Sequence, residues 1–497
     1  MPISKAIPDP GSALTVAHRV PALQPGDRNL VDVALPSVLG TVHRTNRLRP
    51  FQELGVRALA TSPALLLADD MGLGKTVQAV VALDRLREIG ALSAALVIAP
   101  VGLLAQWRRM LREWVPELEV ATIRGPATDR AWQWRRPADI YLTGYETVRA
   151  DLTTHPACPL GRLWDVVVLD EAQRIKNRAT ATAIACKRIP RRRAWALTGT
   201  PLENGVDDLA SICEFLAPWT PDRPVPRLSA GPSLRARHVE LQLRRRKIDV
   251  LRDLPPKTNV AVDLELAGEQ RRTYERAESE GIVRLRALGR DVRVAHIFEL
   301  ITRLKQICNV CPVSGQSAKL DDLESRLSSL EAQGHRALVF SQYAGADGLA
   351  AIEDRTARWR PLVYSGAMSL EEREVVLHRF RRDATHRLLI LSLRAGGQGL
   401  NLADASYVVH FDRWWNPAVE RQEEDRTHRM GQTLPVTVYA YRCLDTIEER
   451  IDEILQAKQA LFDELIDPVT LDLSRLLTKK ELFSLFGLGD PVGDPSN

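Results

Sequence analysis

The chain has 497 residues, of which 45% are hydrophobic and 26% charged, the balance of an ordinary soluble globular protein. This length exceeds what one hydrophobic core serves, so several domains are expected. The formal net charge of +5 is small for the length and permits nucleic-acid binding without indicating it. The sequence contains no apolar run of about 18 residues suited to a membrane helix. Residues 1–23 lack a basic leader and an apolar core, so we expect a cytoplasmic protein.

The six cysteines are scattered, apart from Cys308 and Cys311. A lone C-x-x-C pair holds zinc only with two more ligands, and the chain has no second pair of this kind. Buried thiols in a reducing compartment are therefore favoured over a metal site. We expect no zinc.

Residues 1–44 are rich in Pro, Gly and small side chains, which is typical of a flexible leader or a small N-terminal addition. From residue 45 to about 222, short apolar runs alternate with amphipathic helical stretches, the pattern of a parallel sheet covered by helices. The expected strands are Ala64–Ala68, Ala94–Ala99, Asp139–Leu142, Val166–Leu169 and Ala194–Leu197.

The sequence changes character after Pro218. Residues 223–315 predict a linker followed by a helical insertion, since Trp219–Pro232 is rich in Pro and Leu234–Asn309 is mostly helical and charged. A second strand–helix series fills residues 316–470, and residues 471–497 predict a short helix with a loose end. The expected strands of this second unit are Ala337–Phe340, Leu362–Tyr364, Leu388–Leu391, Tyr407–Phe411 and Val436–Ala440. The predicted fold class is α/β, with two similar lobes.

A phosphate-binding loop is indicated where a buried strand runs into Asp69-Asp70-Met71-Gly72-Leu73-Gly74-Lys75-Thr76 and then into a helix. The two glycines let backbone N–H groups turn toward phosphate at the positive end of the helix. Lys75 would reach the β- and γ-phosphates, and Thr76 would hold Mg²⁺. Asp69 stands where the first Gly of the usual motif belongs, so a plain Gly-rich turn remains the alternative.

Two carboxylates end the next notable strand, in Val166-Val167-Val168-Leu169-Asp170-Glu171. The carboxyl edge of a parallel sheet is where ligands bind. Asp170 can hold Mg²⁺ through water, and Glu171 can polarise the attacking water. A solvated acidic loop is the alternative.

The second unit contains Gln422 to Gln432, in which helical spacing would place Gln422, Arg426 and Arg429 on one face. Two arginines aimed together suit a terminal phosphate that gains charge as it leaves. The alternative is a surface ion-pair ladder with Glu423 and Asp425.

Taken together and in this order, these motifs resemble the superfamily 2 helicase-like ATPases, and more finely the Swi2/Snf2 DNA translocases, over about residues 45–465. Leu48–Gln52 resembles the adenine-reading entry, and Ala68–Thr76 resembles a motif I that lacks the first Gly in this family too. Further similar segments are Val97–Pro100 with Gln106, Thr143–Thr147, Asp170–Asn177, Leu197–Asn204, Leu243–Lys247, Leu254–Lys257, Leu304–Asn309, Val339–Gln342, Tyr364–Gly366, Leu391–Leu402 and Trp414–Pro417.

The sequence departs from the family at two points. Gln173 stands where many members have His, and Val310-Cys311-Pro312 stands where many have His-Pro. No histone-tail reader or other accessory module is apparent. These features argue against nucleosome remodelling and favour a compact bacterial member.

The resemblance implies two RecA-like lobes with ATP and Mg²⁺ in the cleft between them. The catalytic residues it implies are Lys75, Asp170, Glu171, Arg426 and Arg429. The nucleotide-binding residues it implies are Gln52, Asp70, Met71, Gly72, Gly74, Lys75, Thr76, Gly399 and Gln422. Thr76 and Asp170 are the implied Mg²⁺ ligands.

DNA must touch both lobes if closure of the cleft is to move it. The expected contacts are Gln106, Thr143, Arg174, Lys176, Arg394 and Trp415. For Arg191–Arg193 a solvated charged turn and a DNA contact are equally favoured. For Trp414 and Trp415 core packing is favoured over contact with a base.

The function implied is ATP-driven translocation along double-stranded DNA that displaces or remodels bound proteins without separating the strands. A nucleoid-associated location would follow. The alternatives are an ATP-gated subunit of a genome-defence or transcription complex, with a partner protein there, and a strand-separating helicase.

Overall fold

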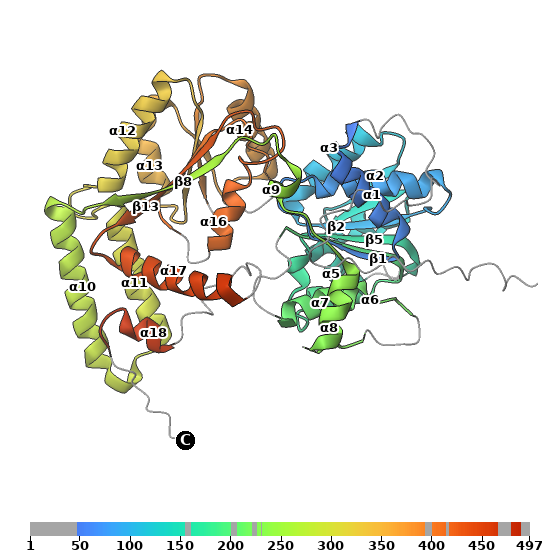
Figure 1. The fold of residues 1–497 in the computed structure, drawn as a ribbon, viewed down its shortest axis with the longest axis horizontal. Helices are drawn as coiled ribbons and strands as arrows, with labels where there is room; N and C mark the ends of the chain where they lie inside the picture. The colour runs from blue at the N-terminus through green and yellow to red at the C-terminus, as the bar shows by residue number, and fades with distance from the viewer. Residues whose placement is uncertain are drawn as a thin grey trace, which may run out of the picture.

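The computed structural model describes residues 47–154, 161–199, 206–220, 226–229, 231–392, 400–413, 417–465 and 479–488. Two parallel sheets, each covered by helices, form two lobes that lie side by side (Figure 1). The short helix α9 (Lys247–Val250) lies where the chain passes from one lobe to the other. The predicted α/β architecture of two RecA-like lobes is confirmed. The expected leader, residues 1–44, lies outside the described residues.

The first lobe is built on a seven-stranded sheet in the order β3-β4-β2-β5-β6-β1-β7, in which every pairing is parallel. Its strands are β1 (Ala64–Leu67), β2 (Ala95–Ala99), β3 (Val120–Ile123), β4 (Ile140–Gly144), β5 (Trp164–Asp170), β6 (Arg191–Leu197) and β7 (Gln242–Leu243). Since β6 lies between β1 and β5, the carboxyl ends of these three strands meet at one edge. The loop after β1 therefore faces the carboxylates that end β5.

Helices cover both faces of this sheet, because its central strands are apolar on both sides. On one face lie α1 (Pro50–Thr61), α2 (Lys75–Glu88) and α3 (Leu104–Trp114). On the other lie α4 (Ala127–Arg135), α5 (Tyr145–Thr154), α6 (Ala181–Arg188), α7 (Val206–Leu216) and α8 (Pro232–Leu241). Short 3₁₀ turns, η2 (Val101–Leu103) and η4 (Ala172–Ile175), lead from β2 and β5.

The second lobe has a six-stranded parallel sheet in the order β10-β11-β9-β12-β13-β8. Its strands are β8 (Lys257–Leu264), β9 (Ala337–Ser341), β10 (Leu362–Tyr364), β11 (Leu388–Ser392), β12 (Tyr407–His410) and β13 (Val436–Cys443). One face packs against α12 (Ala318–Ala332), α13 (Leu349–Arg355) and η6 (Ala357–Trp359), and the other against α14 (Leu370–Arg382). Helix α16 (Pro417–Glu424) follows β12.

A separate apolar cluster joins the helical insertion to the end of the described chain. It contains residues of α10 (Gly268–Leu288), α11 (Val294–Asn309), α17 (Ile447–Leu465) and α18 (Lys479–Ser484), and the 3₁₀ turn η5 (Gly289–Asp291) joins α10 to α11. Figure 1 shows these helices below the second sheet. The short helix expected after residue 471 is therefore present as α18, and its Leu482 and Phe483 are buried.

The segment 223–315 is less separate than the sequence predicts. Its β7 completes the first sheet and its β8 completes the second. Strand β7 has two residues and β8 is an edge strand with one buried residue, Val262, so neither forms an apolar run. Without such a run, apolar patterning does not reveal a strand.

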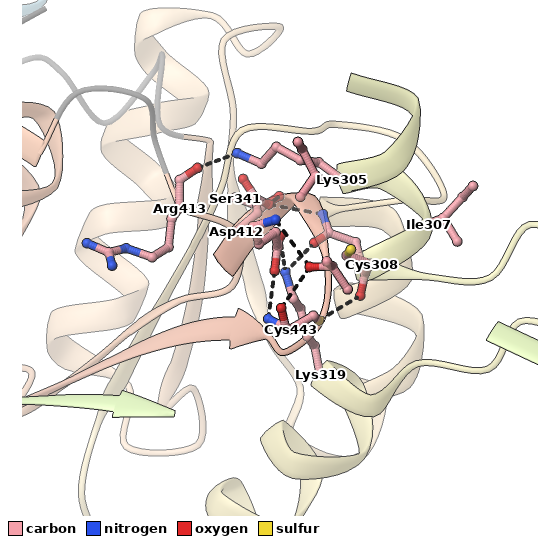
Figure 2. A network of polar contacts seen from close by, with 12 residues as sticks. Lys305, Ile307, Cys308, Lys319, Ser341, Asp412, Arg413 and Cys443 are labelled. Carbon is pink, nitrogen blue, oxygen red and sulfur yellow. Dashed lines mark hydrogen bonds and ion pairs between the residues drawn. The ribbon is translucent and has the colours of Figure 1, made fainter. Parts of the chain in front are cut away.

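A buried polar network holds α11 and α12 against the second sheet (Figure 2). The Asp412 carboxylate accepts hydrogen bonds from Gln342 N at 3.0 Å and from Asn309 Nδ2 at 3.2 Å. Lys319 Nζ donates to Asn309 Oδ1 at 2.9 Å and to Glu448 Oε1 at 2.7 Å. The network fixes the carboxyl end of β9, where the expected motif IV lies, against the helical insertion.

Candidate nucleotide site

The loop between β1 and α2 has the shape of a phosphate cradle. Gly72 and Gly74 have φ of +87° and +76°, which side chains other than glycine rarely adopt, and Gly74 caps α2. The helix begins at Lys75, so its free N–H groups face the loop. Lys75 Nζ donates to the carbonyl oxygen of Asp69 at 2.7 Å and to that of Asp70 at 3.4 Å. The ammonium group therefore lies over the loop. A bound phosphate would replace these carbonyl oxygens as its hydrogen-bond acceptors.

Asp69, which replaces the usual first glycine, has a structural role. Its carboxylate is fully buried and accepts Arg245 Nε at 2.9 Å and Gln78 Nε2 at 3.2 Å. Arg245 also donates to Gln78 Oε1 at 2.7 Å and to the carbonyl oxygen of Phe51. Arg245 lies 176 positions away from Asp69, and nothing in the local sequence pattern pairs the two.

Asp170 ends β5 inside the first lobe, with 6% of its surface exposed. Trp107 Nε1 donates to its Oδ2 at 2.6 Å, and Tyr145 OH donates to its carbonyl oxygen at 2.7 Å. Burial, followed by the nearby Glu171, raises the pKa of Asp170 to about 7, although Trp107 and Lys75 act in the opposite direction. A carboxylate in this condition gains from a bound cation.

Glu171 has a left-handed backbone, with φ of +52°, which turns its side chain out of the strand direction. Gln173 Nε2 donates to Glu171 Oε2 at 2.7 Å, and Thr198 Oγ1 donates to Gln173 Oε1 at 2.9 Å. The Gln173 amide therefore connects the carboxylate after β5 with the residue after β6. A non-glycine residue in this conformation is strained, and such strain gathers at functional sites.

The residues fit a magnesium ion, which takes oxygen ligands and keeps several waters. Asp170 offers a buried carboxylate with a raised pKa, and Thr76 stands in the first turn of α2. Both lie at the same sheet edge, because β5 and β1 flank β6.

Gln52 lies against the phosphate loop, with 4% of its surface exposed. Its Oε1 accepts Arg49 N at 3.0 Å, and its Nε2 donates to the carbonyl oxygen of Leu73 at 3.2 Å. A Cβ added to Gly74 would meet Gln52 Nε2 at 2.6 Å. The glutamine thus supports the loop and caps α1, and its contact with adenine stays a prediction.

The helix expected through Gln422–Gln432 ends earlier, at Glu424, and turns follow. Gln422 is half-buried on α16, but Arg426 and Arg429 lie in the turns, so the prediction of one shared helical face is wrong. Glu423, in the last turn of α16, forms an ion pair with Arg426 in the turn that follows.

Arg426 is buried in the second lobe. Its side chain is 1% exposed and forms a bidentate pair with Glu423, through Nε at 2.6 Å and Nη2 at 3.2 Å. The ion pair given as the alternative for this segment therefore exists between Glu423 and Arg426, though buried rather than on the surface, and a catalytic role for Arg426 stays a prediction. Within the described residues its Nη1 has no hydrogen-bond partner.

Arg429 reaches the phosphate loop from the second lobe. A Cβ added to Gly72 would lie 2.6 Å from Arg429 Cβ. Arg429 Nη1 donates to the carbonyl oxygen of Leu400 at 3.3 Å, while its Nε has no partner in the described parts of the chain. Burial, and then the nearby Arg426, lower the pKa of Arg429 to about 10. An anion beside it would relieve both effects.

Burial contradicts the expected DNA contact at Thr143 and both alternatives considered for Arg191. The side chain of Thr143 is fully buried in β4 and donates to the carbonyl oxygen of Ile123 at 3.3 Å, so it cannot reach a ligand. Arg191 is 4% exposed and donates to the carbonyl oxygens of Lys187 and Ile189, so neither a solvated turn nor a DNA contact describes it. Its neighbour Arg192 is exposed and pairs with Asp165 at 3.3 Å.

The other expected contacts are accessible or lie outside the described residues. Gln106 and Lys176 are half-buried, and Arg174 is exposed, 4.0 Å from Glu146. Arg394, Gly399 and Trp415 fall in segments outside the description, as do Thr200–Asn204 of the expected motif III.

The cysteines in the described parts of the chain are buried and free, as expected for thiols in a reducing compartment. Cys311 lies near Thr273, whereas Cys308 lies with Cys443 and Glu448 in the network of Figure 2, with ligand atoms within 4.8 Å of one another. The Lys319 ammonium already pairs with Glu448 there. That Cys308 and Cys311 hold no zinc stays a prediction.

Two models of known protein families match the chain. The SNF2-related domain matches residues 43–223 and 231–313, more than half of the chain, and the helicase conserved C-terminal domain matches residues 318–431. The chain belongs to the SNF2-related family. The two matched domains correspond to the two lobes, and the first also takes in the segment between them.

Relatives share both lobes. The chain is 33% identical to YwqA of Bacillus subtilis, whose name describes an ATP-dependent helicase/translocase, over 90% of this chain and 51% of that protein. It is 30% identical to mouse SWI/SNF-related matrix-associated actin-dependent regulator of chromatin subfamily A member 1, over 85% of this chain and 44% of that protein. The chain thus spans about half the length of the curated relatives it matches.

Among solved structures, the SWI2/SNF2 ATPase core of Sulfolobus solfataricus in complex with double-stranded DNA is 28% identical. The match covers 89% of this chain and 97% of that structure's chain, with a TM-score of 0.39.

None of the helices within the described ranges is long and apolar enough to cross a membrane.

The contact between Gly72 and Arg429 gives a testable prediction. Gly72→Ala should weaken nucleotide binding, because the new Cβ meets Arg429 and the φ of +87° strains the loop. Gly90→Ala is the matched control, since Gly90 has φ of +70° but open space around it, and should cost only about 1–2 kcal/mol of stability. Titration with a fluorescent ATP analogue and denaturant unfolding would compare them. Equal nucleotide affinity in the two variants would contradict the prediction.

Proposed function

We propose that this chain hydrolyses ATP in the cleft between its lobes and uses the cycle to move along double-stranded DNA. The observation that carries the proposal is the convergence of groups from two lobes on one glycine loop. Lys75, Asp170 and Glu171 stand on the first lobe, and Arg429 packs on Gly72 from the second. An arginine brought from another lobe is a recurrent device in phosphoryl transfer.

Each group has a defined task in hydrolysis. Lys75 would exchange its backbone acceptors for the β- and γ-phosphate oxygens. Asp170 and Thr76 would hold Mg²⁺, which neutralises the developing charge. Glu171 would take a proton from the attacking water while Gln173 holds its carboxylate in place. Arg429 would stabilise the charge of the departing phosphoryl group.

Binding of DNA is inferred from family membership and from basic side chains on the first lobe. Arg174 is exposed near the end of β5, and Lys176 lies half-buried two residues later. A clamp that grips phosphates reads the backbone rather than the bases, so it can follow one strand while the other stays paired. Displacement of bound proteins would follow from this movement.

Substitution of Lys75 and of Glu171 tests hydrolysis directly. Lys75→Ala should abolish turnover, because charge on the β- and γ-phosphates is no longer compensated. Glu171→Gln should still bind ATP but turn over very slowly, since the amide keeps the shape and loses the base. A phosphate-release assay with and without duplex DNA measures both. Near-normal turnover of Glu171→Gln would contradict the assignment, and very low turnover of the wild-type chain would favour an ATP-gated subunit.

The two arginines should behave differently. Arg429→Ala should cut turnover by about 10³ and leave stability nearly unchanged, since it pairs with no carboxylate in the part of the chain that is described. Arg426→Ala should also cost roughly 3–5 kcal/mol of stability, because Glu423 would stay buried without its cation. Denaturant unfolding beside turnover measurements separates the cases. Unchanged stability of Arg426→Ala would contradict the second expectation.

Duplex DNA should stimulate ATP hydrolysis more than single-stranded DNA does, and the protein should displace the third strand of a triplex without unwinding the duplex. Binding should ignore sequence and depend on salt, with log K falling by about 0.9 per phosphate neutralised for each tenfold rise in salt. Filter binding, ATPase and triplex-displacement assays measure these properties. Efficient unwinding of a forked duplex, or stimulation by RNA alone, would argue against translocation and leave ATP hydrolysis standing.

A further inference from the structure

The segment that leaves the first lobe is bound along the phosphate loop. Strand β7 pairs with β1, and two backbone hydrogen bonds continue the pairing beyond it, from Ala68 N to Leu243 O at 2.8 Å and from Asp70 N to Arg245 O at 3.0 Å. The Arg245 side chain adds the buried pair with Asp69. The chain between residues 243 and 247 therefore moves with the phosphate loop.

Lys247 extends this attachment into the second lobe. Its backbone N–H donates to Asp70 Oδ2 at 2.9 Å, which fixes its position against the loop. Its Nζ donates to Asp425 Oδ1 at 2.6 Å and to the carbonyl oxygen of His428 at 2.7 Å. The side chain is 10% exposed, so the ammonium has given up most of its water for these two acceptors. Both acceptors belong to the turn that carries Arg429.

The stem of Lys247 and Arg429 also meet at the same glycine. A Cβ on Gly72 would lie 2.6 Å from Arg429 Cβ and 3.4 Å from Lys247 Cε. The carbonyl that Lys247 holds is that of His428, the residue immediately before Arg429. A shift of the Lys247 ammonium would therefore shift the backbone from which Arg429 projects.

We propose that Lys247 is a positioning residue that holds the turn Asp425–Arg429 against the phosphate loop, so that the approach of Arg429 to the nucleotide is set through the segment joining the lobes. The inference rests on the proposed ATP hydrolysis for its kinetic consequence. The contact between the lobes that the inference describes does not depend on ATP hydrolysis.

Neighbouring ion pairs of the same segment do not link the lobes in this way. Lys257 Nζ pairs with Glu424 Oε2, also at 2.6 Å, but Lys257 lies in β8, a strand of the second sheet, so the pair is internal to the second lobe. Arg49 pairs with Asp253 at 3.0 Å, but the two side chains are 42% and 67% exposed, so that pair contributes little.

The experiment compares Lys247→Met with Lys257→Met. Methionine keeps a long apolar stem and removes the ammonium in both cases. Lys247→Met should lower kcat by about 10- to 100-fold, as expected for loss of charged hydrogen bonds, while the Kd of a fluorescent ATP analogue changes less than about threefold. Lys257→Met should lower stability and leave kcat of the folded protein near that of wild type. An unchanged kcat in Lys247→Met, or an equal loss in both variants, would overturn the proposal.

Two further measurements distinguish positioning from simple loss of stability. Asp425→Asn should give a smaller loss of kcat than Lys247→Met, because the bond to the His428 carbonyl remains, and the double variant should be no worse than Lys247→Met alone. Additive losses in the double variant would count against the proposal.

Small-angle scattering of the nucleotide-free protein needs no turnover. The radius of gyration should increase in Lys247→Met and not in Lys257→Met, because only the former releases the second lobe. An unchanged radius in Lys247→Met would overturn the lobe contact, whereas absence of ATP hydrolysis in the wild-type chain would overturn the proposed function alone.

Discussion

The buried pair of Asp69 and Arg245 is the constraint on which the path of the segment joining the lobes depends. A carboxylate buried away from water is costly unless it pairs with a cation. Here the cation is the side chain of Arg245, which follows β7 in the sequence. Loss of one partner would cost roughly 3–5 kcal/mol, since the other charge would stay buried. The pair therefore requires the segment after β7 to lie on the phosphate loop, and Lys247 follows two residues later.

Among the described residues, Arg426 forms an ion pair with a carboxylate and its neighbour Arg429 does not. Glu423, in the last turn of α16, compensates the charge of Arg426, whereas Arg429 contacts the carbonyl oxygen of Leu400 and lies beside Arg426. A partly desolvated guanidinium near another cation is electrostatically unfavourable. A phosphate group bound in the loop would remove that cost, so nucleotide and lobe contact should favour each other.

Much of this arrangement could be predicted from sequence, because its signals are local. The central strands are uninterrupted apolar runs, and the glycines, Lys75 and the pair of carboxylates follow them directly. The contacts that shape the site are not local. Trp107 meets Asp170 across 63 positions, and Arg245 meets Asp69 across 176. Helical spacing failed after Glu424, where the pairing of Glu423 with Arg426 accompanies a turn, and the burial of Thr143 depends on strands on both sides of β4.

Gln173 illustrates how a departure from a family pattern can preserve geometry. Its amide donates to Glu171 and accepts from Thr198 at once, so the two strand ends are joined through one side chain. A histidine could make both contacts only as the tautomer that donates toward Glu171 and accepts from Thr198. Protonation would remove its acceptor and charge the neighbourhood of Glu171. The glutamine keeps the same connection at every physiological pH, so the Glu171 carboxylate, proposed above as the base, is held by a group that does not titrate.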